Sequence, residues 1–209
     1  MNESIEKIKT ILTKKWKWLL FAISIIFFVA IAEDVFEQEI MKIDTIAYTV
    51  IVENLRTDVL TNIMKFITNL GGLYVLLTIC IVSLIIFKKK KIGLSLFCNL
   101  VIITGANLLV KHIVRRPRPD GYRLITESGY SFPSGHSMVN TAFYGLIIYY
   151  IYHYVKNKKI RNVLCVLISL LIVLIALSRV YLGVHYATDV LAGFLLSIAY
   201  LICFISICD

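Results

Sequence analysis

Six long apolar runs constrain the fold of this chain more than any other feature of its sequence. A helix crosses the hydrocarbon core of a bilayer with roughly 20 apolar residues, and lipid offers no partner to the free N–H and C=O groups of a non-helical segment. We therefore predict an all-α fold, an integral membrane six-helix transmembrane bundle that forms a single polytopic domain over residues 1–209. The predicted spans are residues 18–36, 66–87, 92–111, 136–155, 162–178 and 187–208.

The composition excludes several other classes of protein. Hydrophobic residues make up 59% of the chain, and the mean hydropathy is +0.82, whereas a soluble domain is about 45–50% apolar. An excess of this size excludes a soluble globular fold and a disordered chain. The five cysteines lie singly within the apolar spans. We interpret them as small buried hydrophobes, because their positions do not suggest a disulfide framework.

Clusters of basic residues alternate along the chain and predict its orientation. Lysines precede the first span, and basic runs occupy residues 88–91 and 156–161. Because cytoplasmic segments carry an excess of Lys and Arg, we expect both termini in the cytoplasm and the first, third and fifth connections outside the cell membrane. The N-terminal lysines, the short apolar run and Ala30-Ile31-Ala32 also resemble a cleavable signal peptide, which would leave five spans.

The first connection contains a segment that is too charged to span a membrane. Between residues 40 and 65, apolar side chains recur at helical spacing with acidic residues between them. This pattern predicts an amphipathic surface helix between the first two spans. Such a helix could cover an opening or guide a lipid tail, or it could be a connector that packs against the bundle.

Six cations oppose the usual charge rule, because they lie in or beside the outward third and fifth connections. Such charges are tolerated where they bind a ligand, and arginine is suited to bidentate contact with phosphate. Pro117 and Pro119 stiffen the third connection, so less entropy is lost when a ligand binds. The six cations are Lys111, Arg115, Arg116, Arg118, Arg123 and Arg179.

Two histidines and an aspartate accompany these cations. Ser134 is the predicted N-cap of the fourth span, and Gly135 after it lets a ligand approach the backbone. The free N–H groups at the start of a helix bind anions. Asp189 follows His185 by four residues, so a carboxylate lies one helical turn from an imidazole and orients it as a nucleophile or base. His136 is the candidate acid. The pattern predicts phosphoryl transfer by a nucleophilic histidine, and a metal site is the weaker interpretation because no further ligand completes it.

Three motifs together resemble the signature of the type 2 phosphatidic acid phosphatase superfamily. They are Lys111-x6-Arg118-Pro119, Pro133-Ser134-Gly135-His136 and Ser178-Arg179-x5-His185-x3-Asp189. Within that superfamily, the six-span form and the stretch Gly-Tyr-Ser-Phe before Pro133 resemble bacterial phosphatidylglycerophosphatase B-like enzymes and undecaprenyl pyrophosphate phosphatases.

The resemblance implies a role for each motif residue. His185 would attack phosphorus and form a phosphohistidine, Asp189 would orient and activate it, and His136 would protonate the leaving oxygen. The groups that would hold the phosphate are Lys111, Arg118, Ser134, Gly135 and Arg179. Those left for attraction of the headgroup are Arg115, Arg116 and Arg123. No metal or other cofactor is implied.

We therefore expect an enzyme that dephosphorylates a lipid phosphate or pyrophosphate at the extracytoplasmic leaflet. The candidate substrates are phosphatidylglycerol phosphate, undecaprenyl pyrophosphate and phosphatidic acid. Its partners would be this lipid and the surrounding membrane lipids, with no nucleic acid, and its oligomeric state is open. The alternatives are a lipid phosphotransferase that uses the same phosphohistidine, a vanadate-dependent haloperoxidase, and a non-enzymatic anion-binding membrane protein. The haloperoxidases are soluble, and the last alternative predicts charges or broken helices near the bilayer midplane.

Overall fold

The computed structural model describes residues 2–37, 40–86 and 90–208, with side chains from Lys15 onward, and these residues form helices without strands. The elements are α1 (Asn2–Phe36), α2 (Lys42–Ala47), the π-helix η1 (Tyr48–Glu53), α3 (Asp58–Leu70), α4 (Leu73–Ile86), α5 (Lys90–Val114), α6 (Gly135–Tyr154), α7 (Lys158–Tyr181) and α8 (Ala187–Cys208).

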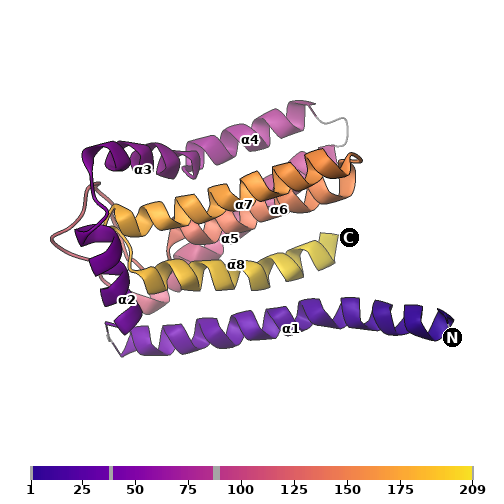
Figure 1. Cartoon of the computed structure of the whole chain (residues 1–209), viewed down its shortest axis with the longest axis horizontal. Coiled ribbons are helices and arrows are strands. Elements are labelled where there is room, and N and C mark those ends of the chain that lie inside the picture. Colours follow the sequence, from indigo (N-terminus) through magenta and orange to yellow (C-terminus); the bar gives the residue numbers. More distant parts are fainter. Residues whose placement is uncertain (1, 38–39, 87–89, 209) are drawn as a thin grey trace.

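The long helices lie side by side, and α6 is at their centre (Figure 1). It packs against α5, α7 and α8, while α1 packs against α8, α4 against α5, and α3 against α7. The main core forms where these helices meet, around residues such as Leu76, Leu100, Phe143 and Ile175. Many large apolar side chains are exposed on the outer helices, for example Ile26 on α1. An apolar outer surface of this kind is suited to lipid.

Within the part of the chain that the structure describes, four helical segments are long and apolar enough to cross a membrane: Lys15–Phe36, Lys90–Val114, Lys158–Tyr181 and Ala187–Cys208. A fifth is added if α3 and α4 count as one bent span. The predicted number of six spans is therefore not confirmed. The difference is α6, which carries Ser137, Asn140 and Thr141 among its apolar residues. These side chains are buried within the protein, so the hydropathy of α6 reflects its central place rather than contact with lipid.

The predicted span 66–87 is not a single straight helix in the described part of the chain. It begins inside α3, and the axes of α3 and α4 differ by 44° at the break that holds Gly71 and Gly72. A Cβ atom on Gly71 would lie 2.6 Å from Nδ2 of Asn140 and 2.8 Å from Ile175, so glycine lets this corner pack onto α6 and α7. Asn140 donates to the carbonyl of Gly71 over 3.0 Å, and Tyr144 donates to that of Leu70 over 2.8 Å.

The surface helix is shorter than predicted. Its continuous part, α2 and η1, ends at Glu53; residues 54–57 form a break, and residues 58–65 of the predicted segment belong to α3. The chain breaks there because Arg56 turns inward to donate to the carbonyl of Tyr181, and the Thr57 hydroxyl caps α3 by accepting from Leu60 N over 3.2 Å. In Figure 1, α2 lies across the end of the bundle that is remote from both termini.

The cysteines depart in part from the expectation of burial. All five are free. Cys80 is buried in the core between α4 and its neighbours, whereas Cys98 on α5 is exposed.

Candidate active site

The predicted site residues gather at the end of the bundle that α2 crosses (Figure 1). They come from the end of α5, the connection that follows it, the start of α6, the end of α7 and the start of α8. The structure brings together residues that are separated by more than sixty positions, such as Arg118 and His185.

His185 and Asp189 form a buried pair at the turn between α7 and α8. Nδ1 of His185 lies 3.3 Å from Oδ2 of Asp189, and the backbone N–H of Tyr186 donates to the same oxygen over 2.9 Å. Gly183 shapes the turn with a φ of +73°, which strains residues that carry a side chain. Burial lowers the pKa of His185 to about 4, although the bond to Asp189 opposes the change. The imidazole is therefore neutral at pH 7.

The second nitrogen of His185 faces the predicted phosphate-binding side. Nε2 lies 3.1 Å from Nη1 of Arg118. Because Nδ1 is directed at Asp189, Nε2 is the nitrogen that can carry the free lone pair. Three backbone carbonyls hold the guanidinium of Arg118 in place over 2.9–3.0 Å; they belong to Ser128, Gly129 and Val184.

The two other predicted phosphate-binding cations are also held by protein groups. Arg179 is 1% exposed and forms an ion pair with Glu127, while its Nη1 donates to the Thr68 hydroxyl over 2.7 Å. Its Nε is buried and has no hydrogen-bond partner among the described residues. Lys111 donates to the carbonyls of Tyr130 and Ser131. Sequence reasoning missed Glu127, because a single acid in a long connection gives no sign of its partner.

The start of α6 brings the candidate acid to the same place. Ser134 is the N-cap, with a hydroxyl that accepts from Ser137 N, and its own backbone N–H donates to the carbonyl of Asp189 over 3.0 Å. Gly135 follows, and His136 in the first turn lies in the electrostatic field of Arg179, Glu127 and His185.

The three remaining arginines are placed differently from one another. Arg115 is exposed just beyond α5, with φ 55°, and Arg123 pairs with the exposed Asp120 over 2.7 Å. Arg116 is 7% exposed and lies 2.6 Å from Oδ1 of Asp189 and 2.9 Å from Oδ2 of Asp44. The predicted role of Arg116 in headgroup attraction does not fit this position, because both of its acidic partners lie inside the protein.

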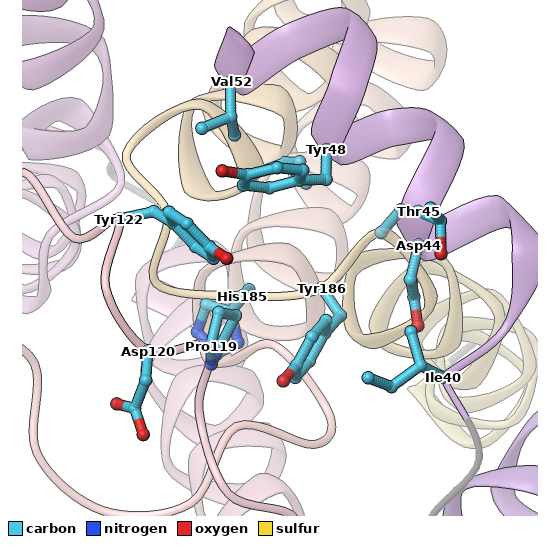
Figure 2. Close-up of a pocket in the computed structure, with 13 residues that line it drawn as sticks. Ile40, Asp44, Thr45, Tyr48, Val52, Pro119, Asp120, Tyr122, His185 and Tyr186 are labelled. Carbon is cyan, nitrogen blue, oxygen red and sulfur yellow. The ribbon is translucent and has the colours of Figure 1, made fainter.

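A cavity of about 340 Å³ adjoins the site on the side of α2. Figure 2 shows aromatic rings of Tyr48 and Tyr122 on one side of it and His185 with Tyr186 on another. The two tyrosine rings lie 4.4 Å apart between their centroids. Of the predicted site residues, all of which the structure describes, His185 is the one that lines this cavity. The cavity therefore adjoins the predicted nucleophile, while the predicted phosphate-binding cations do not line it.

Metal ligands are not grouped in the described residues. Within residues 2–37, 40–86 and 90–208, no three His, Cys, Asp or Glu side chains are placed together so that they could hold an ion.

This combination defines a class: an all-helical membrane protein with a buried His–Asp pair and, at the same end of the bundle, cations of a kind suited to phosphate. The comparisons with known proteins go further, because the model of the PAP2 superfamily matches residues 72–208. The chain belongs to the PAP2 superfamily.

Two similar proteins and one similar solved structure illustrate the family. Phosphatidylglycerophosphatase B of Bacillus subtilis (strain 168) is 35% identical over 143 residues, which are 66% of this chain and 70% of that protein. Undecaprenyl-diphosphatase of Sulfolobus acidocaldarius is 31% identical over 144 residues, 66% of this chain and 65% of that protein. The crystal structure of a transmembrane PAP2-type phosphatidylglycerolphosphate phosphatase from Bacillus subtilis matches with a TM-score of 0.78 and 28% identity, over 90% of this chain and 94% of that one.

Proposed function

We infer that this chain is a membrane lipid phosphatase, a hydrolase that removes phosphate from a lipid phosphate or diphosphate. The observation that carries the proposal is the pair of short contacts around His185, with Asp189 on one ring nitrogen and Arg118 beside the other. Membership of the PAP2 superfamily and the phosphatase names of its relatives support the same reaction.

The proposed first step is attack by His185 on the phosphorus atom of the lipid. The lone pair of Nε2 forms the N–P bond while the bond from phosphorus to the leaving oxygen breaks, and His136, which begins this step as an imidazolium, gives that oxygen a proton and becomes neutral. The ring becomes positively charged, and Asp189 stabilises it through Nδ1–H. The proposed ligands of the phosphate oxygens are Lys111, Arg118 and Arg179, with Ser134 and Gly135 at the start of α6.

The second step returns the enzyme to its resting state. His136 now lacks a proton and takes one from water, whose oxygen attacks phosphorus as the N–P bond breaks. The product is inorganic phosphate, and His185 is neutral again. This sequence balances without a metal ion or a redox partner, and we propose that the reaction is independent of metal.

We propose that the active site opens to the extracytoplasmic side of the cell membrane. The start of α1, the end of α4, the start of α5, the α6–α7 connection and the end of α8 lie at one end of the bundle, whereas the site lies at the other (Figure 1). The basic residues at the end of the bundle that holds the start of α1 and the end of α8 favour a cytoplasmic location for that end. On this proposal α6 is a sixth span, shielded from lipid by its neighbours, in one polytopic domain. The carbonyls at the α3–α4 break are satisfied by α6 side chains, which is unlike a helix break that binds a transported ion.

The substrate classes follow from the relatives and are tested directly. The purified protein in detergent is given phosphatidylglycerol phosphate, undecaprenyl diphosphate and phosphatidic acid in turn, and free phosphate is measured. We expect release from at least one lipid and a preference of 100-fold or more for one class, which corresponds to about 2.7 kcal/mol. Absence of release from all three would contradict the proposal.

Analysis of the lipid products separates hydrolysis from transfer. A phosphatase yields one dephosphorylated lipid and inorganic phosphate. A phosphotransferase that uses the same phosphohistidine yields a second phosphorylated lipid when an acceptor lipid is present.

A further inference from the structure

Asp44 on α2 is part of the buried charge network that ends at His185. The sequence suggested a surface role for this segment, but Asp44 is only 4% exposed. Figure 2 shows Asp44 and Tyr186 beside the same cavity. Its carboxylate makes three contacts with α8 and with the connection after α5, across 144 and 72 positions of the chain.

These contacts fix the geometry of Asp44. Oδ1 accepts from the backbone N–H of Thr188 over 2.8 Å, and Oδ2 accepts from the Thr188 hydroxyl over 2.8 Å. Oδ2 also lies 2.9 Å from Nη2 of Arg116. Asp44 therefore ties α2 to the first turn of α8, next to Asp189.

Arg116 joins the two carboxylates. Its Nη1 lies 2.6 Å from Oδ1 of Asp189 and donates to the Thr188 hydroxyl over 2.8 Å. Its guanidinium carbon lies 4.0 Å from the ring centroid of Tyr186, so stacking fixes the plane of the group. The order of contacts is Asp44, Arg116, Asp189, His185.

The charges of Asp44, Arg116, Asp189 and His185 explain how the carboxylate of Asp44 can stabilise a positively charged His185. With neutral His185, two carboxylates and one guanidinium carry one net negative charge. When Nε2 bonds to phosphorus, the imidazole becomes positive and the cluster becomes neutral. Without Asp44, Arg116 would neutralise Asp189, and the developing imidazolium would face a cluster with no net charge.

We propose that Asp44 is a positioning residue for the nucleophile, which orients Arg116 and offsets its charge so that Asp189 remains effective toward His185. This inference rests on the proposed phosphatase function. It assigns the segment after α1 a place in the active site, because Arg116 and Asp44 together extend the contacts of the His185–Asp189 pair as far as α2. The residue acts through Arg116 and Asp189 rather than on the lipid.

The test compares Asp44→Asn with wild type in the phosphate-release assay. We expect kcat to fall about 10- to 100-fold, which is typical of the loss of a partner that orients a functional group. KM should change less than about threefold, because Asp44 contacts none of the proposed phosphate ligands. Glu53→Gln is the matched control, since it removes an exposed acid from the adjoining η1. Its kcat should equal that of wild type.

A charge-balancing double variant distinguishes this role from a purely structural one. If Asp44 offsets the charge of Arg116, Asp44→Asn/Arg116→Gln should be at least as active as Asp44→Asn alone. A bracing role alone predicts that the double variant is worse, because two sets of contacts are lost. Asp44→Glu keeps the charge and should recover part of the lost kcat, and elution as a single species in detergent confirms that each variant is folded.

The His185→Ala variant in the same assay separates the two claims. If the wild-type protein releases no phosphate, the proposed function fails; if His185→Ala keeps the wild-type rate, the assignment of His185 as nucleophile is overturned and this inference with it. If His185→Ala is inactive while Asp44→Asn keeps the wild-type kcat, the inference alone is overturned. A double variant less active than Asp44→Asn also overturns it.

Discussion

The backbone N–H of Ser134 donates to the carbonyl oxygen of Asp189 over 3.0 Å. This bond joins the N-cap of α6 to the first turn of α8, so the helix that carries the proposed acid is fixed to the helix that orients the nucleophile. A close approach of the two backbones makes it possible. A Cβ atom on Gly193 of α8 would lie 2.9 Å from the carbonyl oxygen of Ser134.

Gly193→Ala should therefore separate α6 from α8. The added methyl group meets backbone atoms, which cannot turn aside as a flexible side chain can. We expect at least a tenfold loss of kcat/KM and a lower melting temperature in detergent. Gly105→Ala on α5 is the control, because a Cβ atom there would have, beyond its own stretch of helix, no atom of the described residues within 4 Å. That variant should be unchanged or stabilised by about 0.4–1 kcal/mol. Equal behaviour of the two variants would contradict the importance of this approach.

The pH dependence of kcat/KM should show an acid limb well below the ordinary histidine value of about 6.5. Burial lowers the pKa of His185 to about 4. Below that value the imidazole is protonated and Nε2 has no lone pair, so the rate falls as the pH falls. Activity should therefore persist at pH 5.5. An acid limb centred at pH 6.5 or above, measured with a substrate whose own ionisation is accounted for, would contradict the lowered pKa of His185.

Arg179→Lys should reduce kcat/KM about 100-fold although the charge is kept. The guanidinium contacts Glu127 and Thr68 together and leaves its Nε free inside the site, an arrangement that an ammonium group cannot reproduce. Inhibition by orthovanadate, which resembles the phosphoryl group, should weaken in parallel. Arg161→Lys, near the opposite end of the same helix, should leave both measurements unchanged. An active Arg179→Lys enzyme with normal vanadate inhibition would show that Arg179 does not bind phosphate.

Removal of metal should leave the rate unchanged. The proposed reaction uses protein cations where other phosphatases use metal ions. Phosphate release is measured after dialysis against EDTA and again after addition of Mg²⁺, Mn²⁺ or Zn²⁺. Rates that agree within about twofold are expected. Loss of activity with EDTA that a metal restores would contradict the metal-independent mechanism.

The sequence was most informative where the relevant contacts are local. His185 and Asp189 are only four residues apart, so the short connection between them keeps the two side chains within reach, although His185 precedes the first residue of α8 and the pair does not share a helix. The long apolar runs likewise locate α5 and α8, because a helix that crosses the bilayer needs an apolar run of about its own length.

Contacts between distant segments explain most of what could not be predicted. In the sequence, Asp44 is one of several acidic residues on an amphipathic segment, and nothing there indicates that it contacts Arg116 in the folded protein. The bend at Gly71 depends on Asn140, which lies 69 positions away. Burial matters in the same way, because the sequence shows that Arg116 is charged but not that it lies inside the protein.

The most direct test of the central claim is detection of a phosphoryl group on His185. The enzyme is mixed with its lipid substrate, quenched within milliseconds at alkaline pH, where phosphohistidine survives, and digested for mass spectrometry. His136→Ala is included because loss of the proposed acid and base should slow the second step and increase the trapped fraction when the leaving group is a good one. We predict phosphate on His185 in wild type and none on that peptide in His185→Ala. Rapid phosphate release by a wild-type enzyme that carries no phosphoryl group on His185 at any time during turnover would contradict the account.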